Sequence, residues 1–152
     1  MSTTARLAEL GIELPAVAAP VAAYVPATVH GDVVYTSGQL PFENGALPAT
    51  GKVGAGIDAE DAKAYARTCA LNALAAAAAA AGGADRIVGV LRVGAFVASD
   101  PSFTGQPGVA NGASEVLGEI FGDAGVHVRA AVGVSVLPLD APVEVEVAFL
   151  LG

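Results

Sequence analysis

The chain has 152 residues, of which 15 are acidic and 7 are basic, and its formal net charge is −8. This length suits a single domain, and an apolar content of 54% is enough to bury a core without disulfides or a metal. The basic residues form no stripe along the chain, so the composition argues against binding of a nucleic-acid backbone.

Features that would direct the chain into or across a membrane are not seen in the sequence. Residues 1–14 lack the charged and then apolar pattern of a signal peptide. The most apolar stretch, residues 62–81, contains Lys63 and Arg67, which a bilayer would bury at high cost. Cys69 is the single cysteine, so no internal disulfide can form. We therefore expect one soluble, cytoplasmic domain that spans residues 1–152.

The first quarter of the chain predicts an extension followed by a β-hairpin. Residues 1–20 are rich in proline and alanine and form the N-terminal extension, with a short helical turn near residues 4–10. Residues 22–29 predict a strand that Pro26 confines to an edge or a bulge. The β-branched and aromatic residues 33–37 predict the partner strand.

The middle of the chain predicts two helices separated by a strand. After a loop over residues 42–57, Asp58 is a typical N-cap for an alanine-rich helix over residues 59–81, which a glycine pair ends. Residues 86–98 are mostly apolar and predict a strand. Residues 109–122 have apolar side chains spaced for one buried face of a second helix.

The last third of the chain alternates apolar and other side chains and predicts two strands that pair with each other. These strands cover residues 128–136 and 143–151, and Glu144 and Glu146 lie on the face opposite the valines of the second one. The resulting order, β-β-α-β-α-β-β, predicts an α+β fold in which two helices cover one face of a mixed sheet. The other face still carries apolar side chains, so we expect a second copy of the chain to cover it.

Arg129 is the residue that most suggests chemistry, because it lies within an otherwise apolar strand. Its planar guanidinium matches a carboxylate through two charge-assisted hydrogen bonds. A buried guanidinium needs a partner, so the alternative is a structural ion pair with Glu144 or Glu146. Glu144 in turn can activate a water molecule as a general base or can simply hold Arg129.

Other polar side chains beside apolar segments have less specific signals. Tyr24, Ser37 and Asn111 are either ligand contacts or ordinary hydrogen-bond partners. Cys69 fits an inert core position, and His127 is interpreted as a loop residue. No phosphate-binding loop, zinc-ligand spacing or nucleophile elbow is present in the sequence, so we expect neither a metal nor an organic cofactor.

Several of these segments together resemble the Rid/YjgF family of small enamine and imine deaminases, over nearly the whole chain. The resemblance depends on Tyr24, on the segment Tyr35-Thr36-Ser37-Gly38-Gln39-Leu40-Pro41, on Val109-Ala110-Asn111, and on Arg129 followed by Leu137-Pro138-Leu139-Asp140 and Val143-Glu144-Val145-Glu146. The segment Gln106–Ser114 and the residues after Arg129 resemble a branch of the family described as endoribonuclease L-PSP-like.

The resemblance implies a chorismate-mutase-like fold that forms a homotrimer around a central β-barrel, with one site in each cleft between neighbouring protomers. It implies that Arg129 grips a substrate carboxylate and that Glu144 positions water. Tyr24, Ser37, Asn111 and Ala131 would then line the cleft. Well-studied members often have a cysteine at the position of Ala131, so the lining of the pocket differs here.

Three functions follow from this resemblance. The first is hydrolytic deamination of reactive 2-imino or enamino acids to 2-keto acids and ammonia, with a small carboxylate-bearing substrate and no cofactor. The second is a non-catalytic module that binds a 2-keto acid or a similar metabolite. The third is ribonuclease activity, against which the acidic charge of the chain counts.

Overall fold

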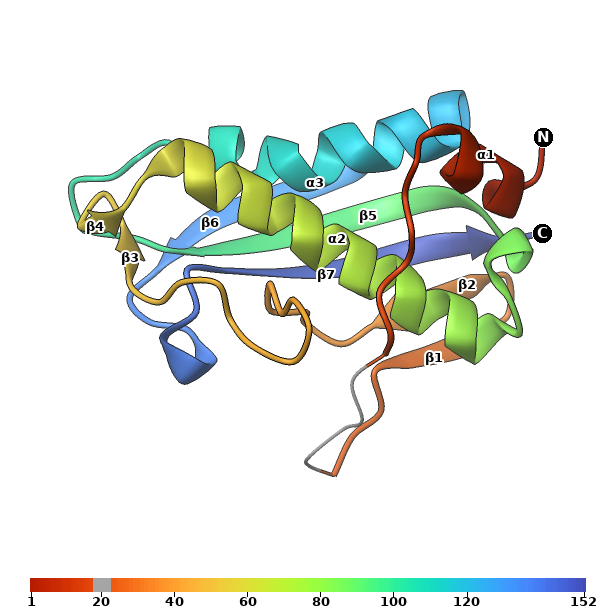
Figure 1. Cartoon of the computed structure of the whole chain (residues 1–152), viewed down its shortest axis with the longest axis horizontal. Coiled ribbons are helices and arrows are strands. Elements are labelled where there is room, and N and C mark those ends of the chain that lie inside the picture. The colour runs from red at the N-terminus through yellow and green to blue at the C-terminus, as the bar shows by residue number, and fades with distance from the viewer. Residues whose placement is uncertain (18–22) are drawn as a thin grey trace.

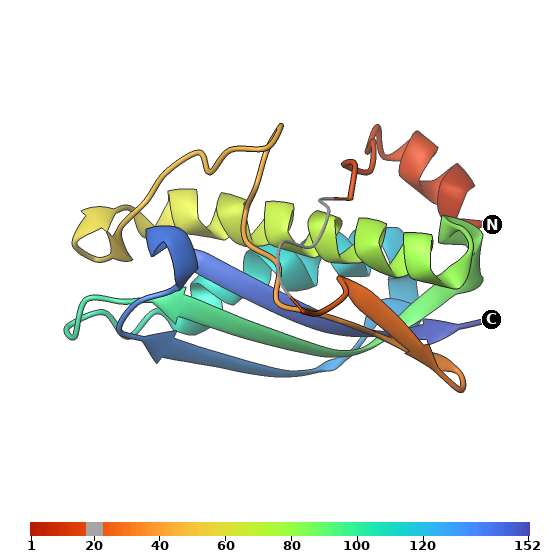
Figure 2. The ribbon, with the colours of Figure 1, turned by 90° about the horizontal axis from the view of Figure 1, so that it is seen from below.

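A five-stranded sheet carries two long helices on one of its faces, as the computed structural model shows for residues 1–17 and 23–152 (Figure 1). The helices and strands, in chain order, are α1 (Thr3–Glu9), β1 (Ala27–His30), β2 (Val33–Thr36), β3 (Lys52–Val53), β4 (Gly56–Ile57), α2 (Ala59–Ala81), β5 (Ile87–Ala98), α3 (Gln106–Phe121), β6 (Val128–Val134) and β7 (Val143–Leu151). The predicted α+β class and the placement of both long helices on one face are confirmed (Figure 2).

The strand order in the large sheet is β1-β2-β7-β5-β6. Strands β5 and β6 are parallel, because α3 returns the chain to the end of the sheet at which β5 begins. The other neighbouring strands are antiparallel. The prediction that β6 pairs with β7 is wrong, since β5 lies between them. Alternation shows which face a side chain occupies, but it does not identify the neighbouring strand. The connection over residues 135–142 is long enough to cross the end of β5.

The predicted bounds of α2 are confirmed, because both ends have strong local signals. Asp58 accepts a hydrogen bond from the Glu60 amide at 3.2 Å, and Gly82 ends the helix with a left-handed φ of 90°. Helix α3 begins at Gln106, before the predicted start, because Pro107 fits the first turn of a helix. Of the strand predicted over residues 22–29, residue 22 lies outside the described residues, and residues 23–26 precede β1 as irregular backbone.

The hydrophobic core lies between the two long helices and the inner face of the sheet. The side chains fully buried there include Val34, Leu74, Val93, Val97, Val109, Val116, Leu117, Val143, Val145 and Phe149. Helices α2 and α3 approach each other closely at Gly112, where a methyl group would lie 2.8 Å from the Lys63 carbonyl carbon. Only a glycine permits this separation, so the position of α3 depends on Gly112.

None of the helices in the described residues lies on the outer face of the sheet (Figure 2). The strand register places Val132 beside Phe96, which in turn lies beside Glu144. Val132 is 45% exposed. The ion pair between Arg92 and Glu146, at 3.3 Å, also lies on this outer face. The chain therefore leaves an apolar sheet surface with a few charges open to solvent. Among the helices that the structure describes, none is long and apolar enough to cross a bilayer.

Candidate functional site

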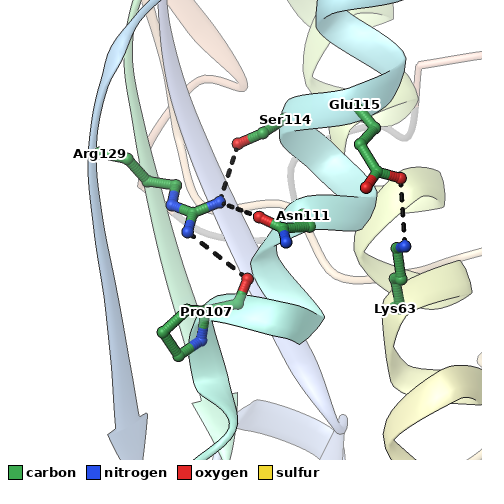
Figure 3. A network of polar contacts seen from close by, with 6 residues as sticks. All are labelled: Lys63, Pro107, Asn111, Ser114, Glu115 and Arg129. Atoms are coloured by element: carbon green, nitrogen blue, oxygen red, sulfur yellow. Dashed lines mark hydrogen bonds and ion pairs between the residues drawn. The ribbon is translucent and has the colours of Figure 1, made fainter.

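Arg129 lies on the edge strand β6 and extends toward α3, on the helix side of the sheet (Figure 3). Its Nη1 donates to Asn111 Oδ1 at 2.8 Å and to Ser114 Oγ at 3.2 Å, and its Nη2 donates to the Pro107 carbonyl at 3.5 Å. Asn111 and Ser114 are three residues apart on α3 and therefore share one helix face. The guanidinium is thus held by neutral acceptors from a single helix.

The alternative of an ion pair from Arg129 to Glu144 or Glu146 is wrong. Both glutamates lie on β7 and on the outer face, and β5 separates that strand from β6. Glu146 pairs with Arg92 instead, at 3.3 Å. Within the described residues, Arg129 contacts no carboxylate.

Three of the five N–H groups of Arg129 have partners among the described residues. The two that remain are Nε–H and one hydrogen on Nη2, and these nitrogens share one edge of the guanidinium plane. A carboxylate recognises such an edge through two parallel hydrogen bonds. Arg129 is also exposed to solvent, so the free edge is accessible to a small anion.

His127 extends this network, contrary to its interpretation as a simple loop residue. Its Nε2 lies 2.9 Å from Ser114 Oγ, and its Nδ1 lies 2.6 Å from the Gly125 carbonyl oxygen. The sequence contained a signal for this contact: His127 precedes Arg129 by two residues, the spacing that puts two side chains of an extended segment on one face. A second signal was the spacing of Ser114, which follows Asn111 by about one helical turn and so lies on the same face of α3.

Ala131 follows Arg129 on the helix side of β6 and is half-buried against the core. Gly133 comes next on the same face, where a methyl group would lie 2.7 Å from Gln106 Nε2. Gln106 is held in place, because it donates to Ser99 Oγ at 3.2 Å and to the Phe103 carbonyl at 2.8 Å. The strand therefore presents only small groups beyond Arg129, and α3 supplies the polar ones.

Glu144, on the outer face of the sheet, lies close to the segment that contains Ser37. Glu144 packs so closely on Gly38 that a methyl group there would lie 2.8 Å from the Glu144 carboxyl carbon. Beside it, Ser37 donates to the Val25 carbonyl at 2.6 Å. Tyr24, which is 55% exposed, is the residue before Val25. Gly38 was not among the predicted site residues, although its place in the Ser37-Gly38-Gln39 segment was a signal.

Burial raises the pKa of the Glu144 carboxyl above its ordinary value, and the negative charge of Glu146 raises it further. A glutamate with a raised pKa holds its proton more strongly and is a better base once it is deprotonated. Burial also raises the pKa of the Cys69 thiol, so the reactive thiolate is disfavoured. This supports the predicted role of Cys69 as an inert core residue.

One chain does not bring all the predicted site residues together. Arg129 contacts Asn111 on the helix side of the sheet, where Ala131 also lies, whereas Glu144 lies on the outer face against Gly38, the residue after Ser37. In the part of the chain that the structure describes, no cluster of histidine, cysteine and acidic side chains could hold a metal. The arrangement offers one anion-binding edge and one half-buried carboxylate, separated by the sheet.

The family model described as "YjgF/chorismate_mutase-like, putative endoribonuclease" matches residues 4–150. The chain belongs to the YjgF family. The Rid/YjgF resemblance seen in the sequence is thereby confirmed. A curated relative, Protein TCP17 of Trypanosoma cruzi, is 45% identical over 143 residues, which cover 93% of this YjgF-family chain and 89% of the relative.

Two solved structures resemble this YjgF-family chain over 99% of its length. The protein Atu1372 of Agrobacterium tumefaciens, described as having unknown function, is 42% identical with a TM-score of 0.90 over 92% of its own chain. A "putative endoribonuclease" from Shewanella oneidensis is 34% identical with a TM-score of 0.93 over 100% of its chain. RidA from an Antarctic Psychrobacter is 31% identical, with a TM-score of 0.60, over 90% of this chain and 94% of RidA.

Proposed function

We propose that this protein hydrolyses reactive 2-imino acids to 2-keto acids and ammonia. The observation that carries the proposal is the free edge of Arg129, which is held in place by α3 and exposed to small anions. Membership in a family that includes a protein named RidA supports it further. We also propose a cytoplasmic location, with which a single buried thiol is compatible.

In the proposed reaction, Arg129 binds the substrate carboxylate through its Nε–H and Nη2–H groups. Asn111, Ser114 and Pro107 keep the guanidinium from turning away. Glu144 accepts a proton from a water molecule, and the oxygen of that water attacks the imine carbon. The imine nitrogen takes up that proton, which gives a carbinolamine. The hydroxyl hydrogen of the carbinolamine then moves to its amino nitrogen, the carbon–nitrogen bond breaks, and ammonia leaves. The carbonyl of the 2-keto acid remains, and no external oxidant or reductant is needed.

The proposed site needs two protomers, because Arg129 and Glu144 lie on opposite faces of the sheet. The outer face, which carries Glu144, is also the uncovered apolar face on which a second copy was expected. We therefore propose a homotrimer in which Glu144 and Ser37 of one protomer face Arg129, Asn111 and Ala131 of its neighbour. Tyr24, close along the chain to Ser37, would line the same cleft.

A non-catalytic binding module is a second candidate, and a specific observation favours it. The Arg129 network is complete within one chain and can hold a carboxylate without Glu144. Ala131 also offers no reactive group next to it. Ribonuclease activity, which the family description mentions, has less support, because the chain has a net charge of −8 and little to attract a phosphate backbone.

The test is an imine-trapping assay with freshly generated 2-iminopropanoate and semicarbazide. The wild-type protein should remove the imine before the trap reacts with it, and Arg129→Ala should lose this acceleration. Arg86→Ala, which removes an exposed arginine outside the site, is the matched control and should behave as wild type. No acceleration by the wild type would refute the deaminase for this substrate. Binding of pyruvate by such an inactive wild type would favour the module.

A further inference from the structure

A continuous chain of hydrogen bonds runs from the buried backbone at Gly125 through His127 and Ser114 to Arg129. Its first link is the 2.6 Å contact between His127 Nδ1 and the Gly125 carbonyl oxygen. Gly125 is itself fixed, because a methyl group there would lie 2.8 Å from the Leu117 carbonyl oxygen. The chain of contacts therefore begins at a rigid point of the fold and ends at the proposed anion site.

The direction of each hydrogen bond follows from the chemistry of the partners. A carbonyl oxygen can only accept, so His127 Nδ1 must carry a hydrogen. In the neutral imidazole, Nε2 is then an acceptor, and it takes the hydroxyl hydrogen of Ser114. With its hydrogen directed at His127, Ser114 presents its lone pairs to Arg129 Nη1, 3.2 Å away.

We infer that His127 is a positioning residue for the anion site and acts on Arg129 through Ser114. This inference deepens the proposed function and depends on Arg129 binding a carboxylate. His127 does not touch the guanidinium, but it determines which way the Ser114 hydroxyl points. Without the imidazole acceptor, the hydroxyl is free to rotate, and one of the contacts that orients the free edge of Arg129 becomes weaker.

The kinetic consequence differs from that of a general structural defect. A carboxylate that does not react is bound equally in the substrate and in the transition state, so weaker binding raises KM and leaves kcat unchanged. A hydrogen bond to a charged group is strong enough that its loss weakens binding by about tenfold. A variant that merely folds poorly would instead lower the amount of active protein and hence the apparent kcat.

The experiment compares His127→Leu, His127→Gln and Ser114→Ala, with His30→Leu as the control for the other, exposed histidine. The Kd for pyruvate and the KM for 2-iminopropanoate should rise about tenfold in His127→Leu and Ser114→Ala. In His127→Gln the amide oxygen can accept from Ser114, so most of the affinity should return. His30→Leu should match the wild type. Melting curves would show that all four variants are folded.

A second, independent test is to measure which ring nitrogen of His127 carries the hydrogen. Long-range ¹H–¹⁵N spectra of the full-length protein at neutral pH should show the hydrogen of His127 on Nδ1. A hydrogen on Nε2, or pyruvate affinities that stay within about twofold of wild type while Arg129→Ala abolishes binding, would overturn the inference. A wild type that binds no pyruvate would overturn it too. If the wild type binds pyruvate through Arg129 but does not hydrolyse the imine, the deaminase proposal fails while the affinities still test His127.

Discussion

Replacing Gly112 with alanine should destabilise the protein, although alanine is the better helix former. A methyl group at Gly112 would lie 2.8 Å from the Lys63 carbonyl carbon and 3.2 Å from the Arg67 amide nitrogen. Both are backbone atoms of α2, so no side-chain rotation can relieve the clash, and α3 must move away. Overpacking of this kind lowers the free energy of unfolding by about 3 kcal/mol at the upper end of its usual range. The better helix propensity of alanine raises it by about 1 kcal/mol.

The net loss of about 2 kcal/mol corresponds to a fall of about 4 to 8 °C in Tm for a domain of this size. The matched control is Gly118→Ala on the same helix, where a methyl group would meet none of the atoms that the structure describes within 4 Å. That variant gains helix propensity without a clash and should melt slightly higher than wild type. Thermal unfolding should be followed at one protein concentration, because assembly also affects Tm. An equal rise in Tm for both variants would refute the close-packing argument.

Three further predictions concern the proposed site and the outer face. Arg129→Lys should raise KM for the imine at least about tenfold, because an ammonium group cannot offer a planar two-donor edge; an unchanged KM would speak against that edge. The raised pKa of Glu144 means that the folded state binds the proton of this carboxyl more tightly than the unfolded state. The protonated carboxyl therefore stabilises the folded state at acidic pH, and this contribution to the free energy of unfolding is lost as pH rises through the folded pKa. Glu144→Gln should therefore gain Tm relative to wild type as pH rises toward neutrality, and a constant difference across pH would contradict the burial effect. Val132→Asp puts a charge on the uncovered sheet face and should leave a monomer of 14.8 kDa in light scattering where wild type is a trimer; a wild-type monomer would contradict the proposed assembly.

Local signals in the sequence were sufficient to predict the helices. Asp58 and Gly82 set the ends of α2 through contacts within a few residues, so its predicted bounds agree with the structure. Alternation in β7 also placed Glu144 and Glu146 on the face opposite its valines. These features depend on neighbours along the chain, and sequence patterns report on such neighbours directly.

Contacts between distant segments were harder to predict. The order of the strands depends on how the connection at residues 135–142 crosses β5, and alternation contains no information about that. The partners of Arg129 were expected on a strand but come from α3, because parallel pairing of β5 and β6 brings that helix over the sheet edge. His127 was missed for the same reason, since its role is visible only once Ser114 lies opposite it.

The placement of Arg129 and Glu144 on opposite sides of one sheet has a genetic consequence. If each site takes its arginine from one copy and its glutamate from the next, a copy that lacks one of these residues can still supply the other to a complete site. An equal mixture of Arg129→Ala and Glu144→Gln subunits, inactive on their own, would then contain intact sites at about a quarter of the wild-type number. Two defective alleles of this gene could complement each other within a single cell.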